Sequence, residues 1–265
     1  MAALFGVCEL CAERTSKAAM MKHLALCAPK HDRASGTPCE LFHLRVEGKG
    51  TAMFWLDVEV KGESPIRRLD DLLRRVWLEC CGHMSAIETG GLRYSVVVDN
   101  EFGPDRNERS MSTKVSQVLT SPGQRLSYEY DFGSTTELTL RFISARTGII
   151  GRSAARLLAR NEPPVWKCAA CDAPATLVCP FCMGEDNPFV CARHAREHTC
   201  ADEESFLPVV NSPRMGVCGY TGGLTSQCGG PGLAWLAPAA DRDRLGGAQI
   251  SHSHISRPPS GSNPR

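Results

Sequence analysis

The placement of cysteines is the feature that most constrains this chain. It has 14 cysteines in 265 residues, and most of them gather in two short segments, residues 8–27 and 168–200. No apolar run is long enough for a membrane span, and the first residues lack the basic stretch and long apolar core of an export signal. We therefore expect a cytoplasmic protein in a reducing compartment, where spaced cysteines bind metal more often than they form disulfides.

The N-terminal group has the spacing C-x2-C-x11-H-x3-C and consists of Cys8, Cys11, His23 and Cys27. Two cysteines separated by two residues can hold zinc from a tight turn, and a His and a Cys four residues apart share one helix face. The segment 16–27 favours a helix on which Met20, Leu24 and Ala25 could cover the metal. Residues 1–33 thus resemble a Cys-Cys-His-Cys (CCHC) variant of the common zinc finger.

The second group supplies eight ligands within residues 165–204: Cys168, Cys171, Cys179, Cys182, Cys191, His194, His198 and Cys200. Eight ligands complete two tetrahedral zinc sites and leave no position for water, which is typical of structural zinc. Because a segment this short cannot build an adequate apolar core, we expect the metal to supply its folding energy. The order resembles the cross-braced MYND and B-box interaction fingers, although a third pair of C-x2-H and a last pair of H-x1-C depart from the MYND order.

Cross-bracing predicts that the first and third ligand pairs share one zinc ion and that the second and fourth pairs share the other. The two expected sets are Cys168, Cys171, Cys191 and His194, and Cys179, Cys182, His198 and Cys200. A sequential arrangement stays open, although the single residue between the last two ligands makes it tight. With the N-terminal finger, three zinc ions are expected.

The intervening residues 38–160 predict an α+β domain that is rich in strands and has one main helix. Alternation at period two predicts strands, and apolar residues at helical spacing predict the helix, with Ser64-Pro65 as its start. A short connecting helix is expected next, and 205–265 reads as an irregular to disordered tail. The expected strands are 42–46, 54–60, 93–98, 125–132 and 136–143, and the expected helices are 69–80 and 152–160.

Two stretches of this domain, PIRRLDDLLRRVWLECCGHMSAIE and LSYEYDFGSTTELTLRFI, resemble a plasmid ORF-three-like family. The family was first named from an Ri plasmid and is also described as insertion-element passenger proteins. The resemblance covers residues 40–145 and implies a compact α+β domain of strands around a helix, with no established activity. Many members continue from Asp-Phe-Gly into an Asp, a Trp and a Glu-His pair, whereas this chain has 134–138 as STTEL, without Trp or His.

The strand at 128–132 is expected to bury its aromatic residues and to expose Glu129 and Asp131. The sequence does not specify a role for this strand. The buried aromatic residues expected on it are Tyr128, Tyr130 and Phe132.

Several cysteines lie outside the two groups. Cys80 and Cys81, with His83, could indicate a nucleophile or another metal site, but a buried helix position and a turn are the favoured interpretation. Cys218 and Cys228 are interpreted as free thiols. No role is assigned to Cys39.

Charge and motifs together narrow the function. The chain has 30 basic and 29 acidic residues, so its whole surface is not expected to grip nucleic acid. No nucleophile–base pair has supportable spacing, so an enzyme is the weakest hypothesis. We expect a non-enzymatic zinc-binding adaptor or regulatory protein with a protein partner and no membrane contact. The alternative is a nucleic-acid-associated factor linked to mobile genetic elements, with weak nucleic-acid binding.

Overall fold

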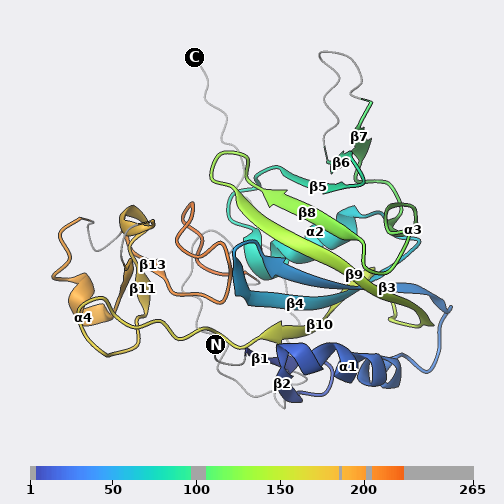
Figure 1. Ribbon diagram of the computed structural model, residues 1–265, viewed down its shortest axis with the longest axis horizontal. Helices are drawn as coiled ribbons and strands as arrows, with labels where there is room; N and C mark the ends of the chain where they lie inside the picture. The colour runs from blue at the N-terminus through green and yellow to red at the C-terminus, as the bar shows by residue number, and fades with distance from the viewer. Residues whose placement is uncertain (1–3, 97–105, 185–186, 201–204, 224–265) are drawn as a thin grey trace, which may run out of the picture. The chain divides into compact units, whose positions relative to one another are not determined.

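The computed structural model describes residues 4–96, 106–184, 187–200 and 205–223, which all lie in the first of two compact units, Met1–Gly230. These residues form a ten-stranded sheet in the order β2-β1-β10-β4-β3-β9-β8-β5-β6-β7 and a small sheet in the order β12-β11-β13 (Figure 1). Strands predominate over helices, and the fold class is α+β, as predicted. None of the helices in the described ranges combines the length and the apolar character needed to cross a membrane.

The centre of the large sheet is the predicted hairpin. Strands β3 (Cys39–Gly48) and β4 (Thr51–Lys61) pair antiparallel, and Gly50 at the turn has a φ of 73°. A positive φ favours glycine, which has no Cβ to clash. Beyond β3 lie β9 (Thr136–Gly148) and β8 (Arg125–Tyr130), which confirm the two later predicted strands.

The far edge of the large sheet contains three shorter strands. The first, β5 (Ser85–Thr89), pairs with β8 and was missed because it is short and its alternation is weak. Strand β6 (Leu92–Ser95) corresponds to the expected strand 93–98, whose last two residues lie outside the described ranges. Strand β7 (Glu108–Ser110) pairs parallel to β6, and the four-residue helix α3 (Val115–Val118) follows.

The main helix packs its apolar side on the sheet. Helix α2 (Arg67–Leu73) continues into a π-helical turn, η2 (Arg74–Leu78), and the buried side chains include Leu69, Val76 and Trp77. The extra residue in a π turn rotates the following residues off the 3.6-residue stripe. Glu79 is already extended, so Cys80 lies after the helix, and the prediction that it belongs to the helix stripe is wrong.

The predicted helix over residues 152–160 is also wrong, because this segment forms strand β10 (Ala155–Asn161). β10 pairs with β4 on one side and with β1 on the other. The sequence RSAARLLAR has good helix formers, but tertiary pairing overrides such weak intrinsic preferences. Leu158 and Ala159 are buried in this strand.

The N-terminal finger extends the large sheet. It consists of β1 (Phe5–Cys8), β2 (Arg14–Ser16), α1 (Lys17–Cys27) and the 3-10 turn η1 (Ala28–His31). The Ser16 hydroxyl accepts a hydrogen bond from the Ala19 N–H and caps α1. β1 pairs antiparallel with β10, and Figure 1 shows α1 beside these two strands. The finger is therefore continuous with the domain through backbone hydrogen bonds.

The sheet face that α2 does not cover carries buried charges. Because side chains alternate along a strand, His43 and Arg45 of β3 and Asp57 and Glu59 of β4 point away from the α2 core. Asp57 accepts hydrogen bonds from His43 at 2.8 Å and from Arg45 at 2.6 Å. Burial alone raises the pKa of Asp57, but these hydrogen bonds outweigh burial and hold the pKa below its usual range.

The same face joins the finger to the domain. Arg45 Nη1 donates to the Lys17 carbonyl of α1 at 3.1 Å. Arg146 and Arg156 each bind both Glu59 and Asp32, which directly follows η1. A second apolar cluster, which includes Met20, Leu24, Trp55 and Leu158, lies between α1 and the sheet.

The expected pattern of strand 128–132 holds only in part. Tyr128 and Tyr130 are fully buried as predicted, but β8 ends at Tyr130. Asp131 has a φ of 65° and is 6% exposed, whereas Phe132 is 46% exposed. The left-handed turn reverses the alternation, so the predictions of a solvated Asp131 and a buried Phe132 are wrong.

The C-terminal module has little regular structure. Its elements are β11 (Leu177–Val178), η3 (Pro180–Cys182), β12 (Phe189–Val190) and α4 (Ala192–Ala195). Strand β13 (Leu207–Pro208) pairs with β11, and Ser212, Arg214 and Tyr220 that follow are buried. Residues 205–223 have mostly irregular backbone and contain buried side chains, and the rest of the expected tail, with Cys228, lies outside the described residues.

Candidate metal centres

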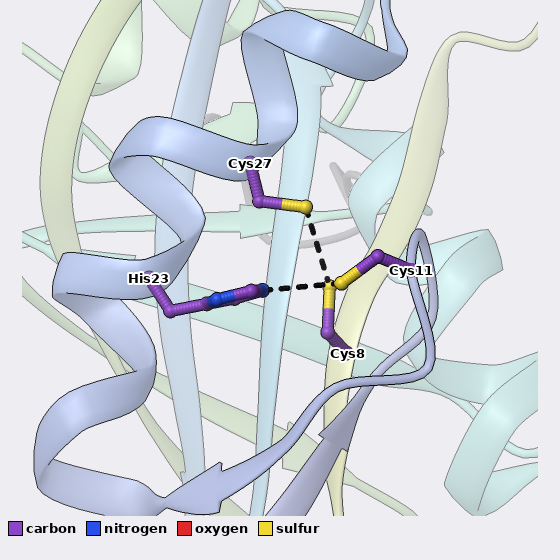
Figure 2. Close-up of side chains that lie close together, drawn as sticks. All are labelled: Cys8, Cys11, His23 and Cys27. Carbon is purple, nitrogen blue, oxygen red and sulfur yellow. Dashed lines mark hydrogen bonds between the residues drawn. The ribbon is translucent and has the colours of Figure 1, made fainter.

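The N-terminal cluster is formed by two local structures that face each other. Cys8 ends β1 and Cys11 lies in the turn toward β2, while His23 and Cys27 lie one turn apart on α1 (Figure 2). Ala12 closes the turn with a φ of 62°. One ligand atom from each of the four residues lies within 4.8 Å of the others, so the structure brings the predicted set together.

The separations in this cluster match a tetrahedral metal site. Ligand bonds of about 2.3 Å for sulfur and about 2.05 Å for nitrogen give tetrahedral edges of roughly 3.8 Å between sulfurs and roughly 3.6 Å between sulfur and nitrogen. The Sγ atoms of Cys8 and Cys27 are 3.9 Å apart, and Cys11 Sγ is 3.4 Å from His23 Nε2. These four residues could hold a metal ion.

The surroundings of the cluster are partly as expected. Met20 and Leu24 are buried beside it, but Ala25 is exposed, so the prediction that Ala25 covers the metal is wrong. Sequence reasoning missed His31, whose Nδ1 lies 3.5 Å from Cys27 Sγ and 3.0 Å from the Cys27 carbonyl oxygen. The spacing Cys27-x3-His31 was the available signal.

The C-terminal module groups its eight ligands into the two sets that cross-bracing requires. The first set is Cys168, Cys171, Cys191 and His194, and the second is Cys179, Cys182, His198 and Cys200. Each set takes one pair from before β12 and one from after it, so the two sets interleave along the chain. Both sets could hold a metal ion.

Distances in the first C-terminal set lie close to tetrahedral edges. His194 Nδ1 is 3.4 Å from Cys168 Sγ and 3.3 Å from Cys191 Sγ, and the Sγ atoms of Cys171 and Cys191 are 4.0 Å apart. Burial raises the pKa of Cys168, but N–H groups of Ala170 and Cys191 and the His194 ring outweigh it and lower that pKa to about 6. The thiolate form, which is the metal ligand, is thus favoured at this position.

The second C-terminal set is tighter. Cys179 Sγ lies 3.5 Å from Cys200 Sγ, and Cys182 Sγ lies 3.4 Å from His198 Nε2. His198 and Cys200, which one residue separates, place Nε2 and Sγ 2.5 Å apart. Phe206 packs edge-on against the His198 ring, and Trp166 stacks on Phe189 beside the module.

A fourth cluster was anticipated only in part, because the sequence suggested a metal site for three of its residues as a less favoured interpretation. Cys80, Cys81, His83 and Cys218 also bring one ligand atom each within 4.8 Å of the others. Cys218 was expected to be isolated, but its Sγ lies 3.2 Å from His83 Nε2. Sequence reasoning did not connect Cys218 with the other three residues because it follows His83 by 135 residues.

The middle domain has a shallow depression of about 410 Å³ near this cluster. At its base, buried Asp70 accepts hydrogen bonds from Tyr128 and Ser85, each at 2.7 Å, and pairs with Arg74 at 3.1 Å. Burial raises the pKa of Tyr128 well above its usual value, so its hydroxyl keeps its proton. The four groups satisfy one another and tie α2 to β5 and β8.

Comparison with known proteins finds a similarity in the middle domain. Residues 41–164 match the family model described as plasmid pRiA4b ORF-3-like protein. The match covers the middle domain and contains none of the ligands of the N-terminal or C-terminal clusters. No curated protein matches the chain.

Among solved structures, a protein of unknown function from Methanosarcina mazei Go1 is similar. The two are 19% identical, the match covers 47% of this chain and 71% of that one, and the TM-score is 0.40.

Proposed function

We propose that this protein is a non-enzymatic adaptor whose two terminal modules are held by zinc and bind a protein partner in a reducing compartment. The observation that carries the proposal is the closed donor set of each module. Each of the three sets supplies three thiols and one imidazole. Four such ligands are enough for the tetrahedral coordination of one metal ion. Zinc is the metal that favours this donor set, and with four protein ligands it has a structural role.

The exposed side of α1 supports protein contact over base recognition. Ala18, Ala19, Lys22, Ala25 and Leu26 are exposed on this helix, and Leu26 is 66% exposed. Reading bases in the major groove needs side chains such as Arg, Asn or Gln that hydrogen-bond to base edges. This surface offers one lysine and several apolar groups.

The C-terminal module also presents apolar side chains. Phe181 is 65% exposed and Met183 is 41% exposed, and both flank Cys182 in the second ligand set. Aromatic and methionine side chains are enriched in the buried cores of protein interfaces. Because a zinc-held turn is rigid, Phe181 can act as an anchor with little loss of conformational entropy on binding.

Carboxylates already neutralise many basic side chains of the described residues. In the finger, Arg14 pairs with Glu162 and Lys17 pairs with Glu47 at 3.0 Å. The middle domain and the C-terminal module contain further ion pairs between a basic side chain and a carboxylate. These pairs are Lys49–Glu137, Arg68–Asp71, Arg93–Glu88, Lys167–Asp172 and Arg193–Glu197.

We therefore predict weak nucleic-acid binding. The full chain should bind mixed-sequence duplex DNA and single-stranded RNA no more tightly than micromolar at about 0.15 M salt, because it can neutralise few phosphates. A salt titration followed by fluorescence anisotropy measures the affinity and its slope. Nanomolar affinity with a steep salt slope would favour the nucleic-acid alternative.

That alternative has one supporting feature. Arg125 and Arg141 line a depression of about 200 Å³ on the outer sheet face, together with Arg45, Glu47 and Thr139. Under this alternative, the face binds phosphates, and the double variant Arg125→Ser and Arg141→Ser should lose the nucleic-acid binding seen in the titration. The family's plasmid name is what links this alternative to mobile elements.

Partner binding should depend on Phe181. When the chain is cross-linked to its partner in native cells, Phe181→Ser should reduce the recovered amount of the main partner by at least about tenfold. A tenfold loss corresponds to roughly 1.4 kcal/mol of binding free energy at an interface anchor. Lys167→Ser, an exposed change in the same module, should leave recovery unchanged. Equal recovery with both variants would contradict a role for this surface.

A further inference from the structure

The fourth cluster joins two distant parts of the chain. Cys80, Cys81 and His83 follow the η2 turn, and Cys218 lies in the segment 205–223 that follows the C-terminal module. His83 Nε2 and Cys218 Sγ are 3.2 Å apart, close to the sulfur–nitrogen edge of about 3.6 Å in a tetrahedral zinc site. The donor set of three thiols and one imidazole is the same as in the other three clusters.

The backbone is bent to bring these ligands together. Gly82, between Cys81 and His83, has a φ of 73°, and Cys218 has a φ of 50°. A left-handed conformation is uncommon for a residue with a side chain and tends to occur where function requires it. Gly216 and Gly219 beside Cys218 also have positive φ, which allows the tight loop that directs its thiol at His83.

The orientation of His83 suits metal binding. Its Nε2 faces Cys218, while its Nδ1 lies 3.6 Å from Asp131 Oδ1. A carboxylate behind the second ring nitrogen commonly fixes the tautomer and orientation of a ligating histidine. Asp131 is itself held by Arg214 at 2.7 Å, and the His83 ring packs edge-on against Tyr130.

A buried guanidinium lies beside the cluster. Thiolates are the form in which cysteines bind metal, and a neighbouring cation favours that form. The guanidinium of Arg214 is fully buried, and its Nη2 lies 3.4 Å from Cys80 Sγ. Arg214 therefore connects the acid behind His83 with one of the thiols.

We propose that Cys80, Cys81, His83 and Cys218 form a fourth zinc site that fastens the segment 205–223 to the middle domain. The segment already contacts that domain through Ser212, which donates to the Trp77 carbonyl at 2.7 Å, and through Asn211, which binds Asn161. A metal ion would add a strong bond between positions far apart in sequence. The site is independent of the proposed adaptor function.

The test is the zinc content of the purified full chain, produced with zinc and without chelator. Elemental analysis and native mass spectrometry should give four zinc ions per chain. Cys218→Ser and His83→Ala should each lower the content by one. Cys39→Ser should keep four, since that partly buried thiol belongs to no cluster of the described residues.

Two reference measurements separate the outcomes. The first is the Cys179→Ser variant, which should lose zinc from the C-terminal module. If Cys179→Ser loses zinc but Cys218→Ser contains as many zinc ions per chain as the unaltered protein, the fourth site alone is overturned. A zinc-free chain overturns both this proposal and the zinc-held modules. Alkylation of the denatured, unreduced chain should label Cys81 and Cys218, whereas a disulfide between them would refute the site.

Folding failure does not weaken this test. If Cys218→Ser fails to fold, four ions in the unaltered chain and three in His83→Ala carry the proposal, and three ions in the unaltered chain refute it. Cobalt loading supplies an independent readout. His83→Ala should lose about a quarter of the thiolate–cobalt charge-transfer absorbance, because all four sets contain three thiols.

Discussion

His23→Ala is expected to remove the zinc ion that we propose for the N-terminal finger and to lower the free energy of unfolding of the domain by about 3 kcal/mol or more. The effect should extend beyond the finger because β1 pairs with β10 within the large sheet. Fully buried Trp55 also packs in the same apolar cluster as Cys8 and Cys27. Chemical denaturation followed by tryptophan fluorescence measures the loss.

His31→Ala is the matched control. His31 lies beside the same Cys27 but is exposed and belongs to none of the ligand sets in the described residues. Its loss should cost about 1 kcal/mol, the size of a single hydrogen bond, and should leave the zinc content unchanged. If both variants unfold at the same denaturant concentration and keep their zinc, His23 is not a ligand.

Asp57→Ala is expected to destabilise the domain by about 3–5 kcal/mol, because it leaves the buried Arg45 without its carboxylate. Asp57 is fully buried and Arg45 is 4% exposed, and the two residues are directly opposite each other in the β3–β4 register. Denaturant unfolding, with circular dichroism to confirm the native fold, measures the change.

Two further variants test the reason for this effect. Asp71→Ala removes a carboxylate from an exposed pair with Arg68 and should cost no more than about 1 kcal/mol. Arg45→Met combined with Asp57→Leu should recover much of the stability, because both charges leave the interior together. An Asp57→Ala chain as stable as the Asp71→Ala chain would show that the buried pair is dispensable.

The Cys/His clusters of the two terminal modules were predictable because their spacing is local. Cys8 and Cys11 share one turn, and His23 and Cys27 share one helix face, so short-range backbone geometry nearly determines their positions. The C-terminal grouping was implied by the resemblance to cross-braced fingers, and the tight spacing of the last pair favoured it over a sequential arrangement. Period-two alternation likewise predicted the β3–β4 hairpin, because one strand face packs on the α2 core.

Local preference failed where distant segments decide the conformation. Residues 155–161 have helix-forming side chains, but β4 and β1 supply hydrogen-bonding partners on both sides and make them a strand. Asp131 lies on what seemed the wet face of a strand, yet the left-handed turn and the guanidinium of Arg214 bury it. The strands that pair with residues 155–161 and the arginine that pairs with Asp131 are all distant from these residues in sequence.

By itself, then, the sequence determined the α+β class, the central hairpin and the twelve residues that gather in the three candidate metal clusters of the terminal modules. Periodicity and ligand spacing over a few residues encode all of these. Only the tertiary structure decided that the finger continues the large sheet and that Cys218 meets His83. These contacts depend on chain segments 135 or more residues apart, and no local pattern specifies which distant segments meet.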